Sequence, residues 1–139
     1  MAHLKSQDIF KIILFPLIVL LIHVAITYGS RWYYTVNGTD TVMHFLGGIS
    51  IALAVNTYIA TGQKHRTIGN SNIFNRFLFI VSIVTLAATC WKMLEFFADQ
   101  TIYHYPHFQP SNFDTMKDLL MGLSGGVITA LLLKVSKRN

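Results

Sequence analysis

The sequence predicts an all-α polytopic membrane protein, a bundle of four transmembrane helices without a soluble domain. Only 12% of its 139 residues are charged, whereas a soluble domain carries about 25%. Four apolar blocks divide the chain, and each has about 20 residues, the length that a helix needs to cross a hydrocarbon core of about 30 Å. Because a helix is the one single segment that satisfies its own backbone in lipid, each block is predicted to be a transmembrane helix of one membrane domain, residues 1–139.

The predicted helices cover about residues 9–30, 41–61, 76–98 and 115–135. Pro16 is expected to produce a mild kink in the first helix. The composition excludes a disordered chain, a coiled coil and an ordinary soluble enzyme, and the single cysteine, Cys90, excludes a disulfide scaffold and a cysteine-based zinc site. The net charge is +5, but the basic residues lie between apolar blocks, so we expect membrane lipids and no nucleic acid as partners.

The distribution of lysine and arginine orients the bundle. One side is predicted to hold eight basic residues, and the first loop of the other side holds Arg31 alone. Basic residues favour the cytoplasmic side, so both termini are predicted to be cytoplasmic. The eight residues are Lys5, Lys11, Lys64, Arg66, Arg76, Lys134, Lys137 and Arg138.

Five of the six carboxylates are predicted at the opposite, outer end. They are Asp40, Glu95, Asp99, Asp114 and Asp118. Interfacial solvation accounts well for Asp99, and helix capping is an alternative for Asp40 and Asp114. Asp118 and His44 lie about one turn inside the apolar blocks, where an ionisable group usually faces a bundle interior or a watery cavity.

Two segments of the chain resemble each other, Asp40–Gly48 and Asp114–Gly122. Each begins an outward-starting helix, places a polar residue four positions after an aspartate, on the same helix face, and supplies glycine one turn deeper. The similarity suggests two parallel helical hairpins related by an axis along the membrane normal. Glycines let helices approach closely in lipid, so we expect the second and fourth helices to meet there and to bring His44 and Asp118 together.

The outer polar residues are candidates for chemistry. An oxygen-rich set with one imidazole suits a divalent cation such as Mg²⁺, Mn²⁺, Ca²⁺ or Zn²⁺, with candidate ligands Asp40, His44, Glu95, Asp114 and Asp118. Alternatively, His44 acts as a general base oriented by Asp118, with Glu95 as the third catalytic candidate. Lys92, three residues before Glu95, could instead pair with it without any chemical role.

These residues carry a resemblance to a known family. The motifs Asp40-x-x-x-His44-Phe45-x-x-Gly48, Lys92-x-x-Glu95-Phe96-Phe97 and Phe113-Asp114-Thr115-x-x-Asp118-Leu119-x-x-Gly122 resemble, in this order, those of the YjdF-like bacterial inner-membrane proteins and, more distantly, the VanZ-like family. The resemblance implies a small polytopic helical protein of the bacterial inner membrane and points toward the cell envelope. In YjdF-like proteins two acids usually stand in the third-helix motif, and here Lys92 replaces the first.

Two classes of function follow from the sequence, with a third as a variant. The first is an envelope enzyme that acts on a lipid or lipid-linked head group at the outer leaflet, with a water-accessible cavity among the second, third and fourth helices. The second is a non-catalytic binding or assembly subunit whose polar cluster holds helices together or recognises a cation or a lipid. A small solute or ion carrier would require a homo-oligomer, because four helices form a thin bundle.

Overall fold

The computed structural model describes residues 5–29, 38–104 and 107–136, and within them it confirms the predicted all-α fold. Four helices are long and apolar enough to cross a membrane: α1 (Ser6–Gly29), α3 (Thr39–Lys64), α4 (Ile73–Ala98) and α5 (Asn112–Ser136). A single π-helical turn, η1 (Asp99–Tyr103), continues α4. The chain is therefore an integral membrane protein built as a four-helix bundle.

The helices begin or end a few residues beyond the predicted limits. For example, α4 begins at Ile73 rather than at residue 76 because the Asn72 side chain caps it and accepts a hydrogen bond of 2.7 Å from the Asn75 N–H group. Arg76, the first residue of the predicted third helix, therefore lies in the first turn of α4. Four of the residues used in these predictions lie outside the described residues. They are the basic residues Arg31, Lys137 and Arg138 and the last residue of the first predicted helix, residue 30.

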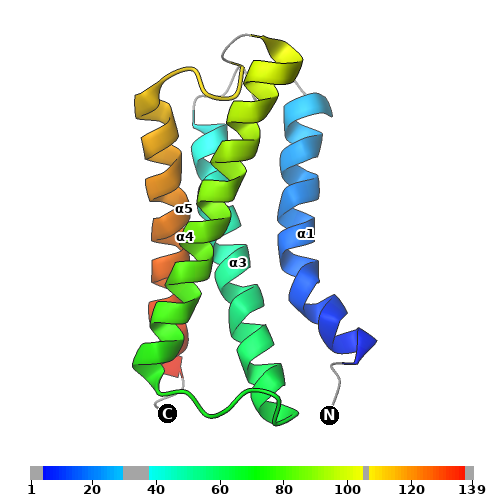
Figure 1. Cartoon of the computed structure of the whole chain (residues 1–139), viewed down its shortest axis with the longest axis vertical. Coiled ribbons are helices and arrows are strands. Elements are labelled where there is room, and N and C mark those ends of the chain that lie inside the picture. Colours follow the sequence, from blue (N-terminus) through cyan, green and yellow to red (C-terminus); the bar gives the residue numbers. More distant parts are fainter. Residues whose placement is uncertain (1–4, 30–37, 105–106, 137–139) are drawn as a thin grey trace.

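The four helices alternate in direction, so both hairpins start from the same end of the bundle (Figure 1). The start of α1, the α3–α4 connection and the end of α5 lie at one end, which we call the basic end. The start of α3, the end of α4 and the start of α5 lie at the other, which we call the acidic end. This arrangement agrees with the predicted parallel orientation of the two hairpins.

The centre of the bundle is the contact between α3 and α5, with α4 packed against both. A Cβ atom on Gly48 would collide with the carbonyl oxygen of Gly122, and a Cβ atom on Gly125 would collide with the carbonyl oxygen of Phe45. The two helices therefore approach through their glycines, as small residues allow in lipid. This confirms the predicted meeting of the second and fourth helices. Below the contact, towards the basic end, lies an apolar core: Ala52, Val55, Ile59, Ile80, Val84 and Ala130.

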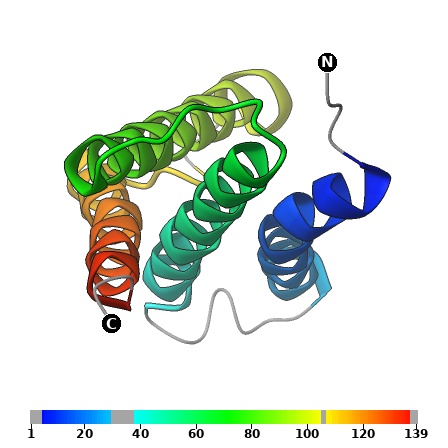
Figure 2. The same cartoon turned by 90° about the horizontal axis from the view of Figure 1, so that it is seen from below.

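Helix α1 is placed differently from α4, its counterpart in the other hairpin. Among the described elements the α1 backbone comes close to that of α3 alone, and Figure 2 shows α1 at the edge of the bundle. No residue in its most apolar stretch is buried, whereas a third of the corresponding stretches of α3 and α5 is buried. The first turns of α1, before Pro16, lean away from its remaining axis (Figure 1), in agreement with the predicted kink.

The basic end contains two polar contacts between elements. Arg76 is buried, and its guanidinium donates to Asn56 Oδ1, at 2.5 and 3.0 Å, and to the Asn56 carbonyl oxygen, at 3.1 Å. His65 Nε2 lies 3.1 Å from Asp8 Oδ2 and so connects the end of α3 to the first turn of α1. These contacts join α4 and α1 to α3 at the end opposite the candidate site.

Candidate functional site

His44 of α3 and Asp118 of α5 meet at the acidic end, directly above the glycine contact. The distance from His44 Nε2 to Asp118 Oδ2 is 3.6 Å. Asp118 is fully buried and the His44 side chain is only 10% exposed. The predicted convergence of these two residues is confirmed, and its physical cause is the absence of side chains at Gly48 and Gly125, which lets the two backbones come within contact distance.

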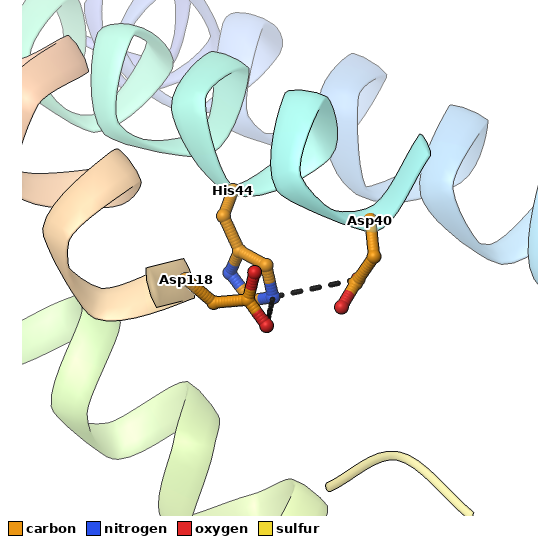
Figure 3. A group of neighbouring side chains, drawn as sticks. All are labelled: Asp40, His44 and Asp118. Carbon is orange, nitrogen blue, oxygen red and sulfur yellow. Dashed lines mark ion pairs between the residues drawn. The ribbon is translucent and has the colours of Figure 1, made fainter. Parts of the chain in front are cut away.

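Asp40 completes a group of three side chains around one space. It lies one turn before His44 on α3, and its Oδ1 is 3.5 Å from His44 Nε2. Figure 3 shows the imidazole edge directed toward both carboxylates, one on its own helix and one on α5. Each of the three residues offers one ligand atom, and these atoms all lie within 4.8 Å of one another.

Lys92 of α4 neutralises the carboxylates on the other side of the cluster. Its Nζ donates to Glu95 Oε2 at 2.6 Å and to Asp118 Oδ2 at 2.9 Å. The predicted Lys92–Glu95 pair is therefore confirmed, and it extends to α5. The second oxygen of Glu95, Oε1, accepts a hydrogen bond of 2.6 Å from Trp91 Nε1, and lies 3.9 Å from His44 Nε2.

The charges of the cluster do not balance. Three carboxylates, those of Asp40, Glu95 and Asp118, lie 3.5–3.9 Å from His44 Nε2. The ammonium group of Lys92 pairs with two of them, Glu95 and Asp118. Buried charges are costly unless they are paired. With all three acids ionised, the cluster holds an excess of negative charge that a bound cation or bound protons would relieve.

Two buried atoms in the cluster have hydrogen-bonding capacity that the described part of the chain does not use. His44 Nε2 and Asp118 Oδ1 are both shielded from solvent and make no hydrogen bond there. Two ligands bound to the same cation at about 2.1 Å are about 3.0–3.4 Å apart in octahedral or tetrahedral geometry. The 3.5 Å between His44 Nε2 and Asp40 Oδ1 is close to that requirement. The 3.6 Å between His44 Nε2 and Asp118 is measured to Oδ2, the oxygen that also accepts from Lys92.

Asp114, the remaining candidate ligand, points away from this group. Its Oδ1 accepts a hydrogen bond of 2.6 Å from Lys117 Nζ, on the same helix face. Its backbone N–H donates to the Ser111 hydroxyl at 3.1 Å, so Ser111 provides the polar group that caps the start of α5. The structure thus brings together Asp40, His44 and Asp118, places Glu95 beside them, and leaves Asp114 in a separate ion pair.

The expectation that interfacial water solvates Asp99 is wrong. Asp99 is only 3% exposed, and its carboxylate accepts hydrogen bonds from the backbone N–H groups of Phe108, at 3.0 and 3.1 Å, and of Gln109, at 3.0 Å. The side-chain amide of Gln109 in turn donates to the carbonyl oxygen of Lys92 at 2.6 Å. The third loop is therefore fastened to the helix that carries Lys92 and Glu95.

Sequence reasoning also missed Trp91, which connects the cluster to α1. Besides donating to Glu95, its ring makes an edge-to-face contact with His23 of α1, with centroids 5.6 Å apart. The spacing of four residues between Trp91 and Glu95 was a usable signal, because such residues are neighbours on a helix. No local sequence pattern predicts the contacts of Asp99 or Gln109, because these contacts form only when the third loop folds back onto the end of α4.

A cavity of about 260 Å³ lies beside His44. It is mostly apolar, and its walls come mainly from α1, α3 and α4, so it is a different space from the water-accessible cavity expected among the second, third and fourth helices. His44 and Trp91 lie at its polar end, and it continues past Gly47 towards Val84. The site thus adjoins an apolar space at the depth of the membrane.

Comparison with known proteins identifies the family but no activity. The chain matches, over residues 4–139, the model of a family described as predicted membrane protein (DUF2238). No curated protein and no solved structure matches it. The match supports the family inferred from the YjdF-like motifs, and it covers all three of them. With four membrane-spanning helices and a match over nearly its whole length, the chain belongs to the DUF2238 family of predicted membrane proteins.

Proposed function

We propose that the protein binds one divalent cation between Asp40, His44 and Asp118 and uses it to act on the phosphate-bearing head group of a membrane lipid. The observation that carries the proposal is the buried pair of atoms, His44 Nε2 and Asp118 Oδ1, which lack hydrogen bonds among the described residues and face a third ligand, Asp40. Buried polar atoms are normally hydrogen-bonded. Two such atoms without a hydrogen bond therefore indicate a missing partner, which an acidic cluster by itself would not.

The donor set limits which cation fits. Two carboxylates and one imidazole suit Mg²⁺, Mn²⁺, Ca²⁺ or Zn²⁺. Lys92 occupies Asp118 Oδ2 and so leaves Oδ1 as the ligand atom. Three protein ligands leave coordination positions open, as in catalytic rather than structural metal sites. A lipid phosphate oxygen and a water molecule would fill those positions.

The surrounding residues would each support this chemistry in a different way. A bound cation polarises a phosphoryl oxygen or activates water. Lys92 fixes the orientation of Asp118, and Glu95 holds Lys92 and Trp91 in place, so Glu95 is a positioning residue in this proposal. Asp40, whose side chain is 19% exposed, is the ligand nearest to the surface and the one a head group would reach first.

The membrane orientation is part of the proposal. Lys5, Lys11, Lys64 and Arg66 belong to the basic end, and the positive-inside rule assigns that end to the cytoplasm. Both termini would then be cytoplasmic and the cation site would face the outer leaflet, in keeping with an envelope protein of the bacterial inner membrane. The site is formed within one chain, so it requires no homo-oligomer.

Binding of Mn²⁺ to the purified full chain tests the site. Titration calorimetry of the wild-type protein in detergent is expected to give one Mn²⁺ per chain. Asp118→Asn replaces a charged ligand with a neutral amide and should lower the affinity by about 100-fold, since even changes to residues that only support a ligand cost 10–100-fold. Asp114→Asn, the matched change four residues earlier, should change it by less than about twofold. Equal affinities in all three proteins would overturn the proposed site.

A structural role for the cluster is the second candidate, because Lys92 ties α4 to α5 through Asp118. Release of the head group or of its phosphate from phospholipid vesicles, with and without a chelator, separates the two. Chelator-sensitive release that Asp118→Asn abolishes supports the enzyme. Mn²⁺ binding without release overturns catalysis and supports a non-catalytic binding or assembly subunit.

A further inference from the structure

The cavity beside His44 runs along the helices and does not lead directly to the end of the bundle. On α3 its wall extends from Met43 to Ile51, and on α4 from Val84 to Trp91. With a rise of 1.5 Å per residue, these walls are about 10–12 Å long. A volume of about 260 Å³ over that length describes a narrow apolar channel.

The channel has one polar end and one open side. His44 and Trp91 form the polar end, next to the carboxylates of the candidate cation site. Its two sides are α1 and α4, whose backbones make no close contact among the described residues. The rings of His23 and Trp91 bring the two helices into contact near the acidic end. The channel therefore opens between α1 and α4, in the direction of the hydrocarbon core.

Small residues and the proline keep the channel open. Gly47, Ala87 and Ala88 line it, and a Cβ atom added at Gly47 would meet nothing within 4 Å. Pro16 lines the wall on the α1 side, where a proline removes a helical hydrogen bond and bends the helix. Gly47 thus faces open space, whereas Gly48 packs against the Gly122 backbone, where a side chain would not fit.

We propose that this channel binds one hydrocarbon chain of a membrane lipid that enters sideways between α1 and α4, with its head group at the cation site. The inference rests on the proposed function and adds the substrate class, a lipid held by its chain as well as by its head group. A soluble phosphate ester has no hydrocarbon chain that could fill an apolar channel open to the bilayer. The volume favours a single chain, because sites for whole drug-sized ligands occupy about 300–1,000 Å³.

Fluorescence quenching of Trp91 tests the occupant. The chain has two tryptophans, and Trp32→Phe leaves Trp91, which lines the channel, as the only one. This protein is reconstituted into phosphatidylcholine vesicles that contain increasing fractions of phosphatidylglycerol with brominated acyl chains. A chain inside the channel gives quenching that saturates at a low fraction of brominated lipid, whereas lipid at the outer surface gives quenching that follows the bulk composition.

Channel-filling variants and matched controls make the result specific. Gly47→Phe should abolish the saturable quenching, and Leu46→Phe, next to it on a more exposed part of α3, should retain it. Ala87→Phe, paired with lipid-exposed Leu86→Phe, repeats the comparison on α4 if Gly47→Phe does not yield folded protein. Saturable quenching that survives both channel-filling changes, or no saturable quenching in any protein, overturns the inference.

Mn²⁺ titration of the same samples separates the two proposals. Gly47→Phe or Ala87→Phe with normal Mn²⁺ binding and lost quenching supports both the cation site and the chain channel. Mn²⁺ binding without saturable quenching in the wild-type protein overturns the channel alone. Saturable quenching without Mn²⁺ binding overturns the proposed function alone.

Discussion

The segments Asp40–Gly48 of α3 and Asp114–Gly122 of α5 share their pattern and differ in their surroundings. Asp40 faces His44 at 3.5 Å, inside the candidate cation site. Asp114, its counterpart, is held by Lys117 at 2.6 Å outside the site. The position that Lys117 occupies in α5 corresponds to Met43 in α3, which is buried. One aligned difference thus decides whether the first aspartate of the segment serves the site or a local ion pair.

The second polar residues of the two segments also differ in their partners. Asp118 is fully buried and accepts a hydrogen bond from Lys92 of α4. In contrast, His44 Nε2 makes no hydrogen bond within the described part of the chain. The comparison shows that similar helix starts can yield an asymmetric cluster, in which the two carboxylates of α5 pair with different lysines and Asp118 shares its lysine with Glu95. Removing those lysines one at a time is the direct way to test this account.

Lys92→Met should have the larger effect of the two lysine changes. It leaves Glu95 and Asp118 buried without their cation, and removing one partner of a buried ion pair costs about 3–5 kcal/mol. The free energy of unfolding in mixed micelles, followed by circular dichroism in the presence of a chelator, should fall by that amount. Added Mn²⁺ should restore part of it, because the metal replaces the lost positive charge.

Lys117→Met is the matched control for that experiment. The Lys117 side chain is 36% exposed, and exposed ion pairs contribute about 0–1 kcal/mol. Its unfolding free energy should therefore remain close to that of the wild-type protein. Equal losses in the two variants, or no rescue of Lys92→Met by Mn²⁺, would contradict the distinction between the two carboxylates of α5.

The glycines that end the two segments give a smaller contrast. A Cβ atom on Gly48 would collide with the Gly122 backbone, but a Cβ atom on Gly122 would meet Ala88 Cβ and the His44 carbonyl oxygen at 3.6 Å, an ordinary contact. Gly48→Ala should lower the free energy of unfolding by about 1–3 kcal/mol, as overpacking does. Gly122→Ala should be neutral or slightly stabilising, because alanine favours a helix by about 1 kcal/mol over glycine. A reversed order in the same unfolding assay would refute this assignment of the contact.

The sequence was sufficient for the features that depend on periodicity. Block length and low charge predicted the four helices, and the repeated Asp-x-x-x-polar-x-x-x-Gly pattern predicted that His44 and Asp118 meet above a glycine contact. Both inferences need only the helix repeat and the cost of polar groups in lipid. The Lys92–Glu95 pair followed from the same repeat.

The sequence did not predict the contacts that depend on how the loops run and on which helices pack together. Asp99 resembles a solvated acid at a helix end until the third loop returns and presents the N–H groups of Phe108 and Gln109 to it. The side chain of Asp114 pairs with Lys117 of the next helical turn. Likewise, the apolar cavity lies where the backbone of α1 approaches α3 and not α4, an arrangement that hydropathy does not predict.

The central claim, that His44 and Asp118 share a cation with Asp40, is tested most directly by pulsed electron paramagnetic resonance of the Mn²⁺-loaded protein labelled with ¹⁵N-histidine. The account predicts modulation from one directly bound imidazole nitrogen, which disappears in His44→Gln and persists in His23→Gln. A Mn²⁺ signal without ¹⁵N coupling in the wild-type protein, or a coupling that survives His44→Gln, would contradict it.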